Sequence, residues 1–172
     1  TIVVGVLLLI VFVLLLFVYQ VRKSQVAIVT TFGKATGEPA GPGAHLKWPW
    51  PIQKVYKFDQ RIHNLESKFE QVLTADGYNL LLAVYVGWSI EQPKLFFPRF
   101  GDSIRTAEES LDDLLRNAYS SVVGQHPFGH FVSADETMLK FIEIEKEMLD
   151  RIQAGVRTNN YGIDVRFLGI KK

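Results

Sequence analysis

The sequence of 172 residues contains no cysteine, only two methionines and almost no net charge. The absence of cysteine excludes disulfides, thiolate metal sites and cysteine nucleophiles. Its 19 basic residues are balanced by 18 acidic ones, and no basic stripe runs along the chain, which argues against binding to nucleic acid. What remains to be explained is the apolar content, which reaches 48% of the residues.

The longest apolar feature is the N-terminal run Ile2–Tyr19, which has no charged or strongly polar side chain. As a helix with a rise of about 1.5 Å per residue, it would span about 27 Å, close to the hydrocarbon thickness of a bilayer. A cleaved signal peptide is the alternative, but the run is too long and no small-residue cleavage site follows it. The sequence therefore predicts a retained transmembrane helix over residues 1–21. Tyr19, Arg22 and Lys23 are expected in the headgroup zone, which favours aromatic rings and cations.

The orientation of this helix stays open at the level of sequence. Arg22 and Lys23 argue for a cytoplasmic domain, but the rule that positive charge stays inside loses force for large domains. The chain begins at Thr1 rather than Met, so we expect upstream residues whose charge is not counted. It stops at Lys172, directly after a strand pattern, so we also expect the natural protein to continue.

Short segments with strand character follow the apolar run. Val26–Phe32 is rich in β-branched residues, and Gln53–Phe58 and Arg61–Phe69 also favour strands. Gly37–Gly43, between them, has the glycine and proline content of turns. These segments predict a small β-rich subdomain over residues 22–71.

Two tryptophans separated by proline lie within this subdomain, in the segment Lys47-Trp48-Pro49-Trp50-Pro51. The prolines exclude regular structure, so the indole rings are expected on a stiff loop. Two interpretations stay open. Either the rings cap the core of the subdomain, or Trp48, Pro49, Trp50 and Pro51 contact the membrane, whose headgroup region favours the apolar body and N–H donor of Trp.

The second half of the chain has the clearest periodicity. In the range Leu80–Ile90 the apolar residues alternate, which predicts a long strand with one buried face. Pro93 ends this strand, and an aromatic connector over residues 96–100 leads to Ser103. From there the apolar spacing becomes that of a helix, and it continues to Val122.

A second helix and a closing strand are expected next. The capping box Ser133-Ala134-Asp135-Glu136 predicts the start of the helix, because its serine and glutamate side chains satisfy backbone donors there. Ile163–Phe167 alternates again as a strand. A strand, two helices and a strand make an α+β subdomain, placed at residues 72–172. Its second helix is expected to bury Met138, Phe141, Ile142, Met148, Leu149, Ile152 and Val156.

Several short motifs occur in one order along the whole chain. They are Phe32-Gly33-Lys34, Gly41-Pro42-Gly43-Ala44-His45 with Trp48-Pro49, Val55 to Asp59 with Arg61, Thr74-Ala75-Asp76-Gly77, and Tyr161-Gly162-Ile163-Asp164-Val165. In order and spacing they resemble the SPFH or band 7 superfamily of stomatins, prohibitins, flotillins and the bacterial HflK and HflC proteins. The HflK/HflC branch is the most similar. The resemblance implies an α+β fold in which one transmembrane helix precedes two SPFH subdomains.

The resemblance also implies a function. Proteins of this superfamily are membrane scaffolds, in which copies or a paralogous SPFH subunit close into a ring or cage around a patch of membrane lipid. A downstream coiled coil, absent from this sequence, supports that assembly. The favoured branch further implies regulation of a membrane AAA protease of the FtsH type, and a bacterial inner membrane location with the domain in the periplasm. A lipid-microdomain organiser without a protease partner is the alternative.

No grouping of residues typical of an enzyme stands out. A nucleophile with a base, paired carboxylates or a metal cluster would be needed. His126 and His130 have the spacing of helical zinc ligands, but Pro127 and Gly129 interrupt the helix that would align them. We therefore expect neither catalysis nor a cofactor or metal, and keep a membrane-anchored hydrolase as a remote alternative.

Acidic clusters recur on the polar sides of both expected helices. A solvated helix face explains most of them. The other interpretation is contact between subunits, because opposite charges on neighbouring copies set register and partner choice in a ring. The residues expected at such contacts are Glu108, Asp112, Arg116, Glu143, Glu147 and Arg151.

Overall fold

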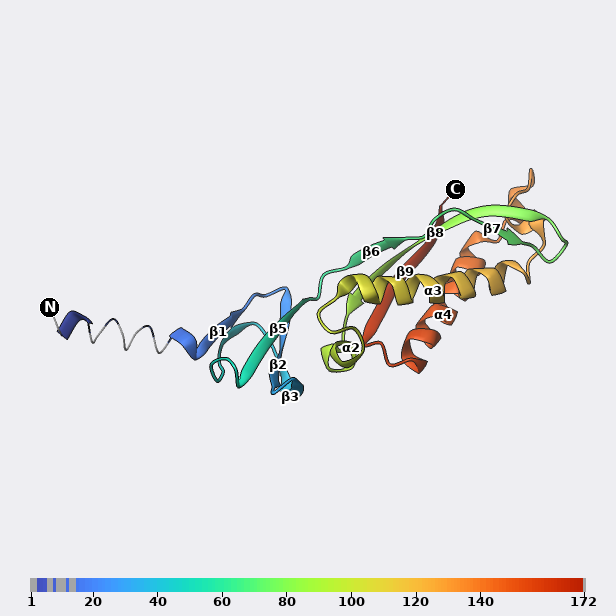
Figure 1. Ribbon diagram of the computed structural model, residues 1–172. Helices are drawn as coiled ribbons and strands as arrows, with labels where there is room; N and C mark the ends of the chain where they lie inside the picture. Colours follow the sequence, from blue (N-terminus) through green and yellow to red (C-terminus); the bar gives the residue numbers. More distant parts are fainter. Residues whose placement is uncertain (1–2, 6–7, 9–11, 13–14, 172) are drawn as a thin grey trace. The chain divides into compact units, whose positions relative to one another are not determined.

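The chain crosses between two compact units more than once. The computed structural model describes residues 3–5, 8, 12 and 15–171. Unit 1 comprises residues 1–61 and 92–102, and unit 2 comprises residues 62–91 and 103–172 (Figure 1). This division differs from the expected boundary between residues 71 and 72, because the strands that follow residue 61 pair with the long strand of unit 2.

Unit 1 consists mainly of short antiparallel strands. They are β1 (Val18–Val21), β2 (Gln25–Thr31), β3 (Lys34–Ala40), β4 (Gly43–Leu46) and β5 (Gln53–Asp59). β1 pairs with β4, and β2 lies between β3 and β5. β2 and β5 share a regular register from Gln25 opposite Asp59 to Thr31 opposite Gln53. The ladder therefore fixes which loops lie at the same end of the unit.

Helix α2 (Pro93–Phe100) completes the core of unit 1. The ring of Phe96 lies 5.5 Å from that of Phe58 on β5, and both side chains are buried. The prediction of an irregular aromatic connector here was wrong. Pro93 occupies the first helical position, where its missing N–H costs nothing, and Pro98 removes only one donor from a short helix.

The last four residues of the helix that was predicted over residues 1–21 form strand β1 instead. Val18 pairs with Leu46 and Val21 with Gly43, so these β-branched residues gain a partner strand that sequence alone does not reveal. Much of the predicted transmembrane span, residues 1–2, 6–7, 9–11 and 13–14, lies outside the described residues. Among those described, no helix has both the length and the apolar character needed to cross a bilayer.

The segment Gly37–Gly43, expected to be a turn, instead contributes to β3 and β4. Pro39 is tolerated in β3 because β3 is an edge strand, where a missing N–H leaves no partner unsatisfied. Pairing of β3 with β2 in a hairpin, and of β4 with β1, which is distant in sequence, thus overrides the local turn composition.

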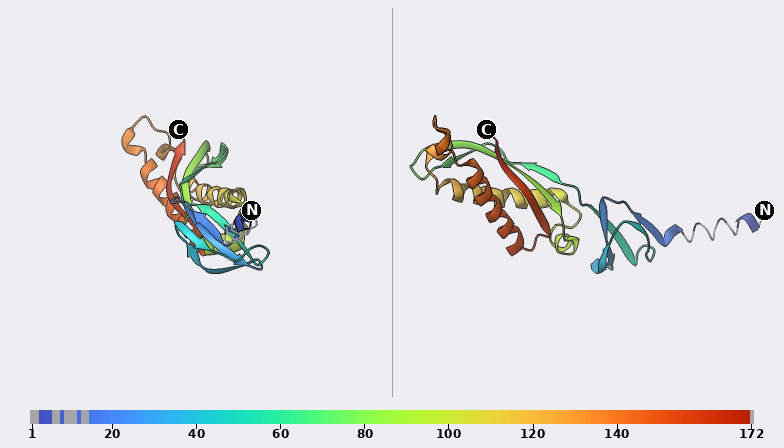
Figure 2. Two further views of the ribbon diagram at one scale, coloured as in Figure 1. Left: turned by 90° about the vertical axis from the view of Figure 1, so that its left-hand side faces the viewer. Right: turned by 180° about the vertical axis from the view of Figure 1, so that it is seen from behind.

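Unit 2 places two helices on one face of an antiparallel sheet (Figures 1 and 2). β8 has β9 along one edge and β6 and β7 along the other. The strands are β6 (His63–Glu66), β7 (Glu70–Leu73), β8 (Asn79–Ile90) and β9 (Ile163–Lys171), and the helices are α3 (Ile104–Val123) and α4 (Phe141–Thr158). The predicted long strand, first helix and closing strand are confirmed, and with them the α+β class.

The core of unit 2 lies between the helices and the sheet. Val84, Val86 and Trp88 of β8 are fully buried, as are Leu111 and Leu115 of α3 and Ile144, Met148 and Ile152 of α4. Ser103 starts α3 as predicted, since its hydroxyl oxygen accepts a hydrogen bond from the Thr106 N–H at 3.2 Å. Unit 2 therefore has a continuous core, to which the alternating residues of β8 and the helically spaced residues of α3 and α4 both contribute.

Helix α4 begins later than the capping box predicted. Asp135 caps a separate 3-10 turn, η2 (Glu136–Met138), by accepting a hydrogen bond from the Thr137 N–H. The helix itself starts at Phe141. Met138 and Ile142 are consequently exposed rather than part of the buried stripe. Another short 3-10 turn, η1 (Phe128–His130), lies between α3 and η2.

Candidate membrane interface

Three segments meet at one end of unit 1. The Lys47 N–H donates to the Phe17 carbonyl oxygen at 2.7 Å, which ties the loop after β4 to the residue just before β1. The Trp48 ring meets the Phe17 ring edge to face, with centroids 6.1 Å apart. The tryptophan loop is therefore held against the point where the N-terminal apolar segment enters the domain.

Gln53 connects this loop to the β2–β3 turn. Its side-chain oxygen accepts a hydrogen bond from the backbone N–H of Trp48 at 2.8 Å. Its side-chain amide nitrogen donates to the Thr31 hydroxyl at 3.2 Å. One residue further on, the Phe32 N–H donates to the Ile52 carbonyl at 3.1 Å. The two loops are thus fixed side by side.

The large apolar side chains at this end face solvent. Trp50 is 80% exposed, Phe32 and Leu46 are each 79% exposed, and Trp48 is 59% exposed. With Ile52, we call these residues the apolar end. Neither indole is among the buried residues that form the core of unit 1, such as Phe58 and Phe96. A cluster of exposed large apolar residues is typical of an interaction surface.

Phe32 is the residue of the apolar end that sequence reasoning missed. It was taken as the last residue of a strand, but it lies in the β2–β3 turn with φ of 48°. A bulky residue in this left-handed region costs about 1 kcal/mol or more. The signal that could have revealed it is the Phe32-Gly33 pair, because a two-residue hairpin turn commonly ends in glycine.

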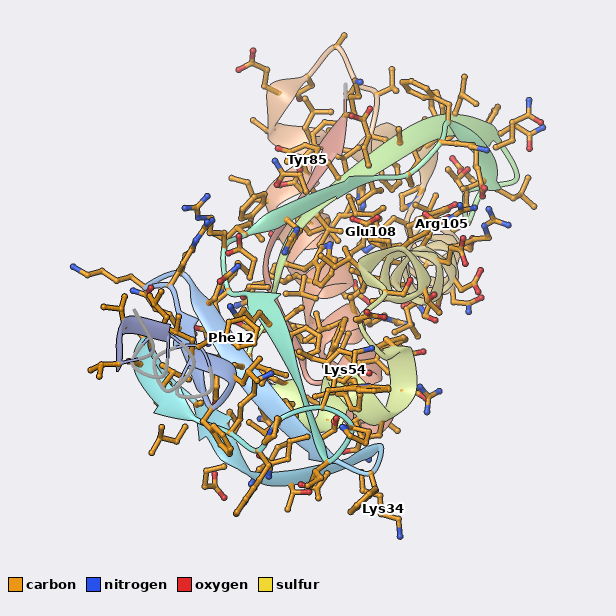
Figure 3. All side chains as sticks on the ribbon, turned by 60° about the vertical axis from the view of Figure 1, so that its left-hand side comes forward. Phe12, Lys34, Lys54, Tyr85, Arg105 and Glu108 are labelled. Atoms are coloured by element: carbon orange, nitrogen blue, oxygen red, sulfur yellow. The ribbon has the colours of Figure 1, made fainter. Side chains whose placement is uncertain are left out.

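Lysines adjoin the apolar end in sequence or in the β2–β5 ladder. Lys34 follows the β2–β3 turn and points outward (Figure 3), and Lys47 precedes Trp48. Lys54, opposite Thr30 in the ladder, has its ammonium 4.7 Å from the centre of the Tyr56 ring. The Tyr56 side chain raises the pKa of Lys54, so this lysine keeps its charge. The surface is therefore both apolar and cationic.

Charge is divided unequally between the two units. Unit 1 carries a formal charge of +6 and unit 2 a formal charge of −5, which together give the +1 of the whole chain. The composition of the whole sequence conceals this division because the two values nearly cancel. Unit 2 has ten basic and fifteen acidic residues; unit 1 has Arg22, Lys23, Lys34, Lys47, Lys54, Lys57, Arg61, Lys94 and Arg99 against Glu38, Asp59 and Asp102.

The other residues expected in the headgroup zone are placed differently. Tyr19 lies in β1 and stacks on His45 with ring centroids 5.5 Å apart, one pair along from Val18 opposite Leu46. Arg22 and Lys23 follow the opposite end of β1. The structure brings Tyr19 near the apolar end, but not Arg22 and Lys23.

The residues expected at subunit contacts mostly have partners inside unit 2. Arg116 pairs with Glu70 of β7, whose second carboxylate oxygen accepts from the Tyr119 hydroxyl. Burial and this hydrogen bond raise the pKa of Tyr119. Glu147 pairs with Arg151 at 3.1 Å, and Glu143 lies 3.5 Å from Lys140. Within the described part of the chain, Glu108 on α3 has no ion-pair partner (Figure 3 labels Glu108), whereas the carboxylate of Asp112 on the same helix attracts the Arg116 guanidinium.

The two histidines with zinc-like spacing come together, but with each other. Their Nδ1 atoms lie 3.1 Å apart, so one imidazole donates a hydrogen bond to the other. His126 Nε2 lies 3.3 Å from Glu147 Oε2. Burial, and then the positive charge of Lys140, lower the pKa of His130. Across residues 3–5, 8, 12 and 15–171, no set of three or more acidic or histidine side chains is arranged to hold a metal ion.

Curated proteins similar to the chain are named HflC. The HflC protein of Buchnera aphidicola subsp. Baizongia pistaciae is 24% identical over 145 residues, which cover 81% of this chain and 40% of that protein. HflC of Vibrio cholerae is 24% identical over 127 residues, covering 70% and 39%. The "Modulator of FtsH protease HflC" of Escherichia coli K12 is 24% identical over 130 residues, covering 72% and 39%. The chain spans about two fifths of the length of these relatives.

A family comparison covers most of the described residues. The model described as "SPFH domain / Band 7 family" matches residues 19–172. The match begins within β1 and extends over both units. This agrees with the order of the motifs from Phe32-Gly33-Lys34 to the Tyr161–Val165 segment. The chain belongs to the SPFH domain / Band 7 family.

Proposed function

We propose that this chain is the membrane-facing part of a non-enzymatic scaffold, and that unit 1 sits on a lipid bilayer through its apolar end. The observation that carries the proposal is the exposure of Trp50 and of Trp48, whose ring contacts Phe17. Indole rings are favoured at a membrane surface because their apolar body and N–H donor find partners in different layers. Pro49 and Pro51 stiffen the loop, so little order is lost on contact.

The proposed membrane arrangement is a single N-terminal span with the domain outside it. The hydrogen bond from the Lys47 N–H to the Phe17 carbonyl supports it, because a helix ending at Phe17 would bring the tryptophan loop to the bilayer surface. The resemblance to the HflK/HflC branch implies a bacterial inner membrane with the domain in the periplasm, and we propose that location for this chain. Tyr19 near the base of the same loop fits the headgroup zone.

We further propose assembly with copies or a paralogous SPFH subunit into a ring or cage that confines a patch of lipid. Family membership supports this assembly. In the described chain Glu108 has no internal ion-pair partner and remains available to a neighbouring subunit. The mass of the protein extracted gently from its own membrane tests the assembly. A large closed oligomer is expected, and a monomer or dimer would contradict it.

Regulation of an FtsH-type membrane protease is the proposed role of the scaffold. The name of the Escherichia coli relative, a modulator of FtsH protease, supports it. The alternative is a lipid-microdomain organiser without a protease, which the lipid-facing character of unit 1 alone would satisfy. Affinity capture from native membranes separates the two: co-purification of an AAA protease favours the regulator, and its absence favours the organiser.

Tryptophan fluorescence tests the membrane contact. The chain has three tryptophans, and Trp88 is fully buried in unit 2, so it serves as an internal reference. We expect lipids with brominated acyl chains to quench the tryptophan fluorescence of the wild-type protein in bilayers. The Trp48→Phe/Trp50→Phe variant, which retains only Trp88, is expected to lose this quenching. Wild-type emission that ignores the brominated lipid would overturn the proposal.

A further inference from the structure

We infer that unit 1 selects an anionic phospholipid surface, which Phe32 and Trp50 enter from two separate loops while Lys34 and Lys47 face the headgroups. The inference rests on the proposed membrane contact and goes beyond it. It adds a second insertion loop and names the class of lipid. Neither feature was expected from the sequence, in which Phe32 ended a strand and the charges balanced.

The β2–β3 turn and the tryptophan loop are held together by hydrogen bonds. Thr31 lies opposite Gln53 at the end of the β2–β5 ladder, and the Phe32 N–H donates to the Ile52 carbonyl. Phe32 therefore cannot move independently of the loop that carries Trp50. Both side chains are about four-fifths exposed. Two aromatic rings that project from hydrogen-bonded neighbouring loops enter a bilayer together, and the ordering cost has already been met by folding.

The conformation of Phe32 supports a role outside the fold. Its φ of 48° is a strained value for an aromatic residue, whereas Gly33 next to it adopts φ of 83° without strain. Phe32 also buries little surface that would offset the strain. Residues held in sparsely populated backbone regions often serve a function. A ring that gains an apolar environment on membrane contact accounts for both the strain and the exposure.

The charges decide between lipid classes. Lys34 and Lys47 adjoin the two aromatic loops in sequence, and Lys54 lies one ladder position from Gln53. Unit 1 as a whole is strongly basic although the chain is not. A zwitterionic surface gains nothing from such an excess, whereas each lysine near an anionic leaflet strengthens attachment about fivefold. The combination of aromatic and cationic residues at one end fits an anionic lipid surface.

A tryptophan reporter at position 32 tests the inference. In the Trp48→Phe/Trp50→Phe background, Phe32→Trp places an indole in the β2–β3 turn, with buried Trp88 as the reference. The full chain is reconstituted into bilayers of phosphatidylcholine alone or mixed with phosphatidylglycerol, each with brominated acyl chains. The matched control is Gln60→Trp in the same background. Gln60 is exposed and follows β5 at the opposite end of the ladder, where its N–H donates to the Ser24 carbonyl.

We expect quenching of the position-32 reporter in phosphatidylglycerol bilayers, clearly weaker quenching in phosphatidylcholine, and none at position 60. If wild-type Trp48 and Trp50 are quenched but the position-32 reporter is not, the second loop is refuted while the proposed function survives. If neither is quenched, both fail. Equal quenching in the two lipids would refute the lipid class.

Charge variants test the headgroup contacts. Lys34→Gln and Lys47→Gln are each expected to lower the ratio of quenched to unquenched reporter in phosphatidylglycerol about fivefold. Lys57→Gln removes the same charge from the same unit, but about 10 Å further along β5 from Lys54, beyond the screening length of about 8 Å. An equal effect of Lys57→Gln would show that net charge alone acts and would overturn the local contact. Inorganic phosphate that abolishes the lipid preference at matched ionic strength would show that the lysines bind free phosphate, and would overturn the assignment to a lipid surface.

Discussion

Units 1 and 2 place their tryptophans in opposite ways, because Trp48 and Trp50 of unit 1 are exposed and Trp88 of unit 2 is fully buried. Unit 2 buries Trp88, Leu111 and Met148 between two helices and a sheet. Unit 1 buries only a small core around Phe58 and leaves the apolar end in solvent. Since burial of apolar surface is the main force in folding, exposure on this scale calls for a partner outside the fold.

The charges of the two units differ in the same sense. The exposed apolar side chains of unit 1 go with an excess of cations, and the packed core of unit 2 goes with an excess of acids. Anionic lipid attracts the first and repels the second. One chain thus combines a basic unit that exposes aromatic loops with an acidic unit that has a packed core, although its composition as a whole shows neither.

The contrast is one of arrangement, because unit 2 also has exposed apolar residues. Two of them, Tyr85 and Phe167, lie on the sheet face away from the helices, and their rings cover glycines (Figure 3 labels Tyr85). A Cβ atom at Gly169 would lie 2.3 Å from the Tyr85 ring, and one at Gly87 would lie 2.3 Å from the Phe167 ring. These rings cover backbone, whereas Phe32 and Trp50 project from loops.

The largest expected effect comes from placing a carboxylate in each unit. Val84→Asp buries a charge in the fully closed core of unit 2 and should destabilise it by about 4 kcal/mol or more, enough to unfold it. Trp50→Asp places the same charge in solvent and should change stability by about 1 kcal/mol or less. Thermal unfolding followed by circular dichroism measures both. Similar melting temperatures for the two variants would break the comparison.

A smaller effect is expected from removing the indoles. Trp48→Ala/Trp50→Ala should weaken membrane contact by about 1.5–3 kcal/mol per ring while leaving unit 2 folded. Hydrogen exchange of the backbone N–H groups from Lys47 to Gln53, measured in bilayers, reports the loss. Trp88 emission serves as the control for folding. Unchanged protection of the loop in bilayers would contradict its membrane contact.

How far the sequence predicted this molecule depended on whether the signal was local. The long strand β8 and helix α3 have complete apolar periods and local caps, so both were found. β1, β3 and β4 were missed because their stability comes from partners 20 or more residues away or from an edge position that tolerates Pro39. Helix α2 was missed because Pro93 and Pro98 read as breakers, although a first-turn proline favours a helix.

The candidate site was predicted only in part for a related reason. Trp48 and Trp50 stand out in sequence because rare residues alternate with proline. Phe32 does not, since its exposure depends on a turn whose position is set by pairing between β2 and β3. The segregation of charge was hidden because residues 92–102 return to unit 1, which no local pattern indicates.

A pH-dependent loss of stability is expected in unit 2 and sharpens the comparison further. The lowered pKa of His130 means that the folded state binds fewer protons than the unfolded chain, so this stability is present above about pH 6.5 and is lost on acidification. When both Nδ1 atoms carry a proton, the hydrogen bond between His126 and His130 has no acceptor and is lost. The melting temperature should fall less steeply from about pH 7 to about pH 5 in His130→Gln than in the wild type. Identical slopes would refute the assignment.

The smallest expected effect concerns the polar face of α3. Glu108→Gln should change the free energy of unfolding by no more than about 0.5 kcal/mol, since this carboxylate has no ion-pair partner among the described residues. Arg116→Gln, which breaks the pair with Glu70, is the contrasting variant and should cost more. Chemical denaturation measures the two. A larger cost for Glu108→Gln would show that its role is internal and not at a subunit contact.

The apolar end of unit 1 is expected to touch lipid, and the exposed sheet face of unit 2 is not. Leu81→Trp in the Trp48→Phe/Trp50→Phe background reports on that sheet face, because Leu81 is exposed there. Its quenching by brominated lipid in bilayers is compared with that of the wild type. We expect strong quenching of the fluorescence of Trp48 and Trp50 and none at position 81. Equal quenching at both places would contradict it.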